Sequence, residues 1–206
     1  MHDLQQIDRP RVVEGEVNYA VDNGGVNRFH ARNSALDTFA HDTRRVPIAD
    51  ARTAEDAPRL DREGFALMKM PTAVADFRDR DAVATVHAPE IVRFIQGMSD
   101  ADAVVLAGPA ALRFGERAAA TDRARHSKTA RLVHSDSGLG ASADFTRDYD
   151  PHPGRPIART VHHNIWRTFS APPQDLPLAL CDFRSVDPGD LLRGEAAFDD
   201  DQGQIS

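Results

Sequence analysis

The apolar residues of this chain fall into short segments separated by polar turns, and this pattern restricts the folds available to it. A run such as 103–107 is far shorter than the roughly 20 apolar residues that a membrane-spanning helix needs. Segments such as 17–21 have instead the length of single strands, and the Asn23-Gly24-Gly25 sequence that follows is a turn signal. We therefore predict a mostly β fold with flanking helices and no membrane span.

Local patterns indicate where the individual elements lie. A helix is expected from Pro89, which suits a first helical turn, to Gly97, and Glu90 suits its positive N-terminus. A long polar loop is expected after the glycines at 138 and 140, and the stretch 113–128 fits either a helix or a loop. Strands are expected at 12–13, 17–21, after the Gly24 turn, at 64–71 and 103–107, from 129 onward, at 161–169 and at 176–181.

The composition favours one domain that acts on a small molecule. The chain has 206 residues, of which 41% are hydrophobic, so a single domain spanning 1–206 can bury a core. Its net charge of -7 and its scattered basic residues argue against a nucleic-acid partner, and a small-molecule substrate fits better. The first six residues do not resemble a signal peptide, and the lone Cys181 cannot form an internal disulfide. We expect a cytoplasmic protein.

His134 and Asp136 form the most informative local motif. They follow the apolar pair Leu132-Val133 and precede a glycine turn, and side chains two residues apart on a strand project to the same side. An imidazole and a carboxylate so placed supply two legs of the two-histidine, one-carboxylate triad that holds non-haem Fe(II). The alternative is a surface pair or a hydrogen-bonded turn, which short motifs of this kind often are.

Several segments resemble the CmcJ/NvfI (AsaB-like) oxidoreductases, which are Fe(II)- and 2-oxoglutarate-dependent enzymes that oxidise small metabolites. The most specific parts are the Asn164-x-Trp166-Arg167 and Pro177-Leu178-Ala179-x-Cys181-Asp182 sequences. Glu63-Gly64-Phe65 running into the segment from Met70-Pro71 to Asp76-Phe77 also matches, in the same order along the chain. The resemblance extends over 17–206.

The resemblance implies a double-stranded β-helix, or jelly roll, with His134 and Asp136 as iron ligands. It implies Fe(II) as the metal and 2-oxoglutarate as the co-substrate, bound by Arg167 with Asn164 and Trp166 of the same segment. A forked guanidinium suits the distal carboxylate of 2-oxoglutarate. Arg167 has alternative roles, because it could stack on Trp166 or pair with Asp182. A homo-oligomer is left open.

The third iron ligand is not evident in this sequence. His162 and His163 are adjacent on an expected strand, so at most one of them points inward, and His152 lies in a proline-flanked loop. The resemblance places the missing histidine in a Pro-His segment further along than Pro-Leu-Ala-x-Cys-Asp, and 203–206 looks like the start of a strand. We therefore expect the N-terminal portion of a jelly-roll oxygenase, incomplete at its C-terminus and inactive if no other ligand completes the site.

Two other classes of function remain open. The glycines at 138 and 140, with Ala143, fit the G-x-G-x-x-A pattern of a dinucleotide or S-adenosylmethionine site, but a polar loop is expected there instead of a helix. A methyltransferase or methoxylation-associated protein is one alternative, and a non-catalytic degenerate remnant is the other. Cys181 is a poor nucleophile candidate, since a lone cysteine with apolar neighbours is usually inert core.

Overall fold

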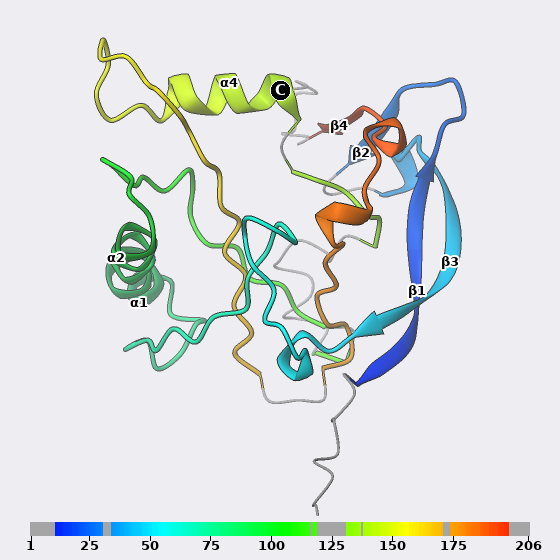
Figure 1. The fold of residues 1–206 in the computed structure, drawn as a ribbon, viewed down its shortest axis with the longest axis horizontal. Helices are drawn as coiled ribbons and strands as arrows, with labels where there is room; N and C mark the ends of the chain where they lie inside the picture. Colours follow the sequence, from blue (N-terminus) through cyan, green and yellow to red (C-terminus); the bar gives the residue numbers. More distant parts are fainter. Residues whose placement is uncertain are drawn as a thin grey trace, which may run out of the picture. The chain divides into compact units, whose positions relative to one another are not determined.

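The computed structural model describes residues 11–30, 34–115, 117–118, 131–136, 138–170 and 174–197 (Figure 1). The chain folds into two compact units, each assembled from separate stretches of sequence. The first unit comprises 1–69, 129–134 and 176–206, and the second comprises 70–128 and 135–175. The expected strand start at 203–206 lies outside the described residues. A single domain over 1–206 stays a prediction.

A long antiparallel strand pair dominates the first unit. Strand β1 (Val12–Val21) pairs with β3 (Ala40–Ala49) along its whole length, as the blue and cyan arrows of Figure 1 show. β1 confirms and joins the strands expected at 12–13 and 17–21. β3 was not expected, because its sequence is largely polar and contains Pro47. In the described residues β3 pairs with β1 alone, and edge strands are where sheets accept proline.

The other edge of β1 holds the segment that carries His134. Leu132 forms an isolated parallel bridge with Asn18, and the Val133 N–H donates to the Asn18 carbonyl at 2.9 Å. The strand expected from residue 129 is thus reduced, in its described part, to a single bridge. This bridge fixes the backbone immediately before His134 against the sheet.

A second, smaller sheet in the first unit pairs two segments that are far apart in the sequence. Strand β2 (Asn27–His30) follows the turn in which Gly24 adopts a φ of 74°, a conformation that glycine tolerates best. β2 confirms the strand expected after this turn, but it does not pair with β1. It pairs in parallel with β4 (Gly194–Ala197), which was not expected, and the Arg28 guanidinium bonds Glu195 across the pair at 2.8 Å.

The second unit contains a continuous helical stretch. Helix α1 (Arg80–Ala82), the π-helical turn η3 (Val83–His87) and helix α2 (Ala88–Met98) follow one another without a break. The carboxylate of Asp79 caps the start by accepting the N–H groups of residues 81 and 82. The helix expected from Pro89 to Gly97 is confirmed, but the helical backbone begins nine residues before Pro89 and ends one residue after Gly97.

Helix α4 (Leu139–Asp148) occupies the start of the expected polar loop. Its N-cap is Gly138, and two local contacts support its second half. Arg147 pairs with Asp144 at 2.7 Å one turn away, and the rings of Phe145 and Tyr149 stack with centroids 5.8 Å apart. The prediction of a loop here was wrong because these neighbour contacts outweigh the weak apolar periodicity of the segment.

The remaining elements are short 3-10 turns: η1 (Ser34–Leu36), η2 (Ala51–Thr53), η4 (Phe183–Ser185) and η5 (Pro188–Asp190). The stretches 64–71, 103–107, 161–169 and 176–181 form no strand, so those predictions were wrong. Apolar alternation alone does not make a strand, because the backbone groups must pair with a second segment, and no described segment forms a ladder with these stretches. Sheets and a few helices are present, and the described residues close no barrel, so the jelly roll stays a prediction.

Candidate functional site

Arg167 lies in a hollow of about 420 Å³ in the second unit. Its guanidinium donates to the Met70 carbonyl at 2.6 Å and lies 5.8 Å from the centroid of the Phe77 ring. Phe77 in turn stacks on Phe169, with centroids 5.3 Å apart and planes 19° from parallel. The hollow thus combines a cation with two aromatic rings, and Thr72, Val74 and Arg78 also line it.

The charge of Arg167 is not balanced by a described carboxylate. Its contacts are a neutral carbonyl and a ring, so neither alternative expected for it is seen: the ring is that of Phe77, and Asp182 pairs with Arg184. The one carboxylate that lines the hollow, Asp76, accepts the backbone N–H of Arg78 at 2.9 Å. A guanidinium in a partly apolar hollow is suited to binding an anion.

His134 belongs to the first unit and is exposed. Its Nδ1 donates to the Leu132 carbonyl at 2.7 Å, because a carbonyl oxygen can only accept. In the neutral ring this bond places the proton on Nδ1, since one imidazole nitrogen then donates and the other accepts. Metal-ligating histidines commonly have this arrangement, in which a backbone carbonyl fixes the tautomer and the ring orientation.

Asp136 and Asn164 meet in the second unit. The Asn164 side-chain amide donates to Oδ2 of Asp136 at 2.6 Å, across 28 positions of sequence. Two residues that the sequence singled out for different tasks are thus direct neighbours, and Asn164 orients the carboxylate. Trp166, predicted to take part in co-substrate binding, is an exposed residue, at 52%.

The two predicted iron ligands, His134 and Asp136, belong to different units. His134 is the last residue of its stretch in the first unit, and Asp136 belongs to the second unit. Within the part of the chain that the structure describes, no three His, Cys, Asp or Glu side chains gather closely enough to hold a metal ion. The donor types suit Fe(II), but these residues do not complete a triad.

The other histidines have different surroundings. His162 packs against the Phe145 ring, with centroids 5.7 Å apart and planes nearly perpendicular. His152 donates its backbone N–H to Asp150 in a loop, and His163 is half-buried. None of these three belongs to a described group with metal-binding geometry.

The glycine motif at Gly138 opens a helix after all, since α4 begins at Leu139. One objection to a dinucleotide or S-adenosylmethionine site, the lack of a helix, was therefore wrong. The other objection stands, because such a site needs an acidic residue at the end of a second strand about 20 residues further on. The described residues form no strand there.

Cys181 is exposed, not buried in a core as expected. Its sulfur lies 3.5 Å from the Ser185 hydroxyl and 3.8 Å from the Asp182 carbonyl. Both contacts are local, because they join Cys181 to residues one and four positions further along the chain.

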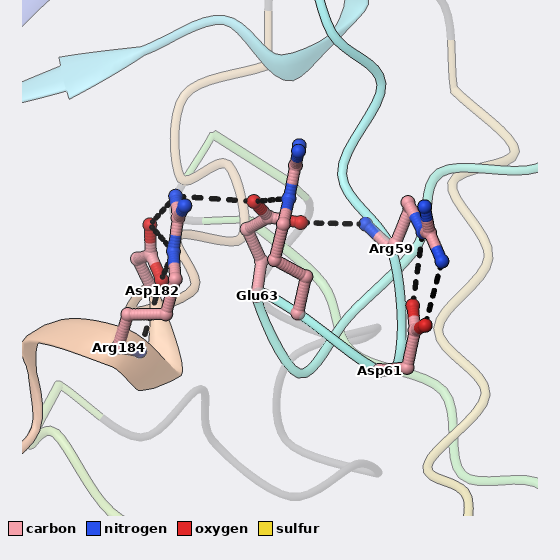
Figure 2. A network of polar contacts seen from close by, with 6 residues as sticks. Arg59, Asp61, Glu63, Asp182 and Arg184 are labelled. Atoms are coloured by element: carbon pink, nitrogen blue, oxygen red, sulfur yellow. Dashed lines mark hydrogen bonds and ion pairs between the residues drawn. The ribbon is translucent and has the colours of Figure 1, made fainter.

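A network of charged side chains joins two of the segments that carry the family resemblance (Figure 2). Glu63 is buried, and its carboxylate accepts the Arg59 N–H at 2.8 Å and pairs with Arg62 and with Arg184, the latter at 3.1 Å. Arg184 also grips Asp182 at 2.6 Å. The Arg59 N–H, with the guanidinium of Arg62, holds the pKa of Glu63 below its usual range.

Gly64 explains how these two segments approach so closely. The Phe183 N–H donates to the Glu63 carbonyl at 2.9 Å, and Gly64 has a φ of 84°. A Cβ at Gly64 would lie 3.1 Å from Cβ of Phe183. The backbone at Glu63-Gly64 therefore packs directly against the backbone at Asp182-Phe183, more than a hundred positions further along the chain.

The sequence singled out Arg167 as a candidate but gave no sign of the residues that surround it. Phe77 lies within a segment that carries the family resemblance, yet nothing in the sequence relates it to Phe169. The aromatic character of both was the available signal. Their contact is decided by the folded chain.

Comparison with known proteins places the chain in a family. Residues 14–206 match the family model described as an oxidoreductase/YMDC permease-like domain. The chain belongs to that family. The match agrees with the oxidoreductase class that the CmcJ/NvfI resemblance implied, and it does not extend to the CmcJ/NvfI family itself. No curated protein and no solved structure matches the chain.

The family supports a general oxidoreductase role for this chain. Among the helices of the described part, none combines the length and the apolar character that a bilayer crossing requires.

Proposed function

We propose that this chain is an Fe(II)- and 2-oxoglutarate-dependent oxidoreductase of the CmcJ/NvfI type, with a jelly-roll fold, that acts on a small metabolite. The observation that carries the proposal is the Arg167 guanidinium, which lines a hollow and has no described carboxylate partner. The family match supports the oxidoreductase class on independent grounds.

The hollow has the size and chemistry for a small acid. Its volume of about 420 Å³ lies in the range of roughly 300–1,000 Å³ typical of ligand pockets. The stacked rings of Phe77 and Phe169 give the hollow apolar surface beside the Arg167 guanidinium. The distal carboxylate of 2-oxoglutarate is the group we assign to Arg167.

His134 and Asp136 are the iron ligands in this proposal. Iron bound there would supply the oxidation by molecular oxygen. The chain's own contributions are the Leu132 carbonyl, which sets the His134 tautomer, and the Asn164 amide, which orients the Asp136 carboxylate. Since the described residues provide no third ligand, we derive no reaction step through the metal.

The proposal is tested by titrating the protein with 2-oxoglutarate and following the fluorescence of Trp166, the only tryptophan, which is adjacent to Arg167. Arg167→Ala is expected to weaken binding by about ten- to a hundredfold, the usual value of hydrogen bonds to a charged group. Arg167→Lys keeps the charge but loses the two parallel N–H donors of the guanidinium, so it should recover only part of the affinity. Arg93→Ala, in the same unit, is the matched control.

Three results separate the competing functions. Binding of 2-oxoglutarate that depends on Arg167, with iron-dependent release of succinate lost in His134→Ala, supports the oxygenase. Binding of S-adenosylmethionine without iron supports the methyltransferase, for which the helix that opens after Gly138 is the favouring observation. Binding of neither compound supports the non-catalytic remnant and overturns the proposal.

A further inference from the structure

The buried His87 and the partly buried Glu90 form a pair next to the Arg167 hollow. Their side chains are only 5% and 16% exposed, and Nδ1 of His87 lies 3.4 Å from Oε2 of Glu90. Neither residue lines the hollow, and neither has a role in the proposed function. Buried ionisable groups are costly to maintain, so the contacts that they make are informative.

Glu90 does not serve the start of its own helix, as its sequence position suggested. The helical backbone is already continuous from Arg80, so the N–H groups at the start of α2 are not exposed there. The carboxylate instead reaches across to a loop. It accepts the Thr72 hydroxyl at 2.6 Å and the Ala73 N–H at 2.8 Å, and these two bonds lower the pKa of Glu90.

Through Thr72, Glu90 fixes one wall of the hollow. Thr72 lines the hollow, and its hydroxyl oxygen also accepts the Val74 N–H at 3.2 Å. Val74 is 8% exposed and lines the same wall. Two residues before Thr72, the Met70 carbonyl accepts the bond from Arg167. The loop 70–74 is therefore held by Arg167 at one end and by Glu90 at the other.

Through His87, Glu90 is connected to a second wall. The His87 and Phe77 rings meet edge to face, with centroids 5.0 Å apart and planes at 87°. Phe77 is the ring that contacts both Phe169 and the Arg167 guanidinium. His87 closes the π-helical turn η3, and π-helical turns occur often at functional sites.

We propose that Glu90, together with His87, is a positioning residue for the Arg167 hollow. Its carboxylate holds the loop 70–74 and the Phe77 ring in the arrangement that presents the guanidinium to a small carboxylate ligand. The inference rests on the proposed function for the identity of that ligand, but the positioning itself rests on the contacts of Glu90.

The test compares Glu90→Ala and Glu90→Gln in the full chain, with Asp144→Ala as the control carboxylate in the same unit. Two quantities are measured: 2-oxoglutarate affinity from Trp166 fluorescence, and hydrogen exchange of peptides that cover 70–78 and 165–170. Glu90→Ala should weaken binding by about tenfold, a usual cost of losing an outer partner of a site, and should speed exchange in both peptides. Glu90→Gln can still accept the Ala73 N–H and bond Thr72, so it should restore most of both.

The outcomes distinguish this inference from the proposed function. If the wild type binds 2-oxoglutarate and Glu90→Ala binds it equally well, or if only the 70–78 peptide exchanges faster, the positioning role is wrong. If the wild type does not bind 2-oxoglutarate, the proposed function fails. In that case faster exchange in 165–170, reversed by Glu90→Gln and absent in Asp144→Ala, would still support the positioning role.

Discussion

Arg184 in the first unit and Arg167 in the second are two arginines with opposite surroundings. Arg184 contacts two carboxylates, those of Asp182 and Glu63, and both of its partners come from the protein itself (Figure 2). Arg167 contacts a carbonyl and a ring and lines a hollow. The first arginine joins segments of the chain, and the second has charge available for a ligand.

This difference shows that residues carrying the same family resemblance can have different roles. Both arginines lie in or beside segments that resemble the CmcJ/NvfI oxidoreductases, yet Arg184 forms ion pairs with Glu63 and Asp182 of the same resembling segments. Their presence is explained by folding alone. Arg167 has no such carboxylate contact among the described residues, and our proposal assigns it a ligand instead.

The largest effect on the first unit is expected from Glu63→Ala. Removing this buried carboxylate leaves Arg62 and Arg184 without their shared acceptor and leaves the Arg59 N–H without its hydrogen-bond acceptor. The melting temperature should fall by several degrees, measured by circular dichroism. Glu63→Gln can still accept the Arg59 N–H, so its melting temperature should fall less. Equal melting temperatures of both variants and the wild type would contradict a stabilising network.

A double comparison should separate the two arginines. Arg184→Ala should lower the melting temperature and leave 2-oxoglutarate affinity unchanged, because its carboxylate partners stabilise the fold. Arg167→Ala should do the reverse, with about tenfold or greater loss of affinity and a small change in melting. If both variants changed the same property, the distinction between a joining arginine and a binding arginine would be lost.

Gly64→Ala should destabilise the first unit by about 1–2 kcal/mol, the usual cost of a left-handed conformation for a residue with a side chain. The new Cβ would also press on Phe183 at 3.1 Å. Urea unfolding measures the loss. Gly108→Ala is the control, because a Cβ there meets nothing within 4 Å and its φ is not left-handed; equal stability of the two variants would contradict the close approach.

The smallest expected effect is on the pH dependence of stability. The pKa of Glu63 is lowered in the folded chain, chiefly by the Arg59 N–H, and that of Asp182 chiefly by Arg184. A lowered folded pKa means that the stabilisation is present above the unfolded value, about 4.3 for Glu, and is lost as pH falls through the folded value. The difference in melting temperature between wild type and Glu63→Gln should therefore shrink below about pH 4. A difference that stayed constant with pH would show that the carboxylate charge is not involved.

Local patterns predicted the parts of the fold whose stability is local. The Asn23-Gly24-Gly25 turn, strand β1 and helix α2 all follow from a few neighbouring residues, such as Pro89 at a first helical turn. In the candidate site, Arg167 was identified from its segment, and Asn164 and Asp136 were identified separately. Their direct contact at 2.6 Å was not foreseen.

Strand pairing and the walls of the hollow were decided only in the folded chain. β3 is polar and contains proline, yet it pairs along all of β1, whereas the stretch 161–169 pairs with no described strand. A strand exists only when another segment satisfies its backbone groups, and that segment can be far away, as β4 is from β2. The sequence by itself therefore determined the residue types available for anion binding and the local turns. Tertiary structure decided that Glu63 pairs with Arg184, and that Phe77, Phe169 and Glu90 surround or support Arg167. These contacts join residues far apart in the sequence, so no helix or strand periodicity relates them.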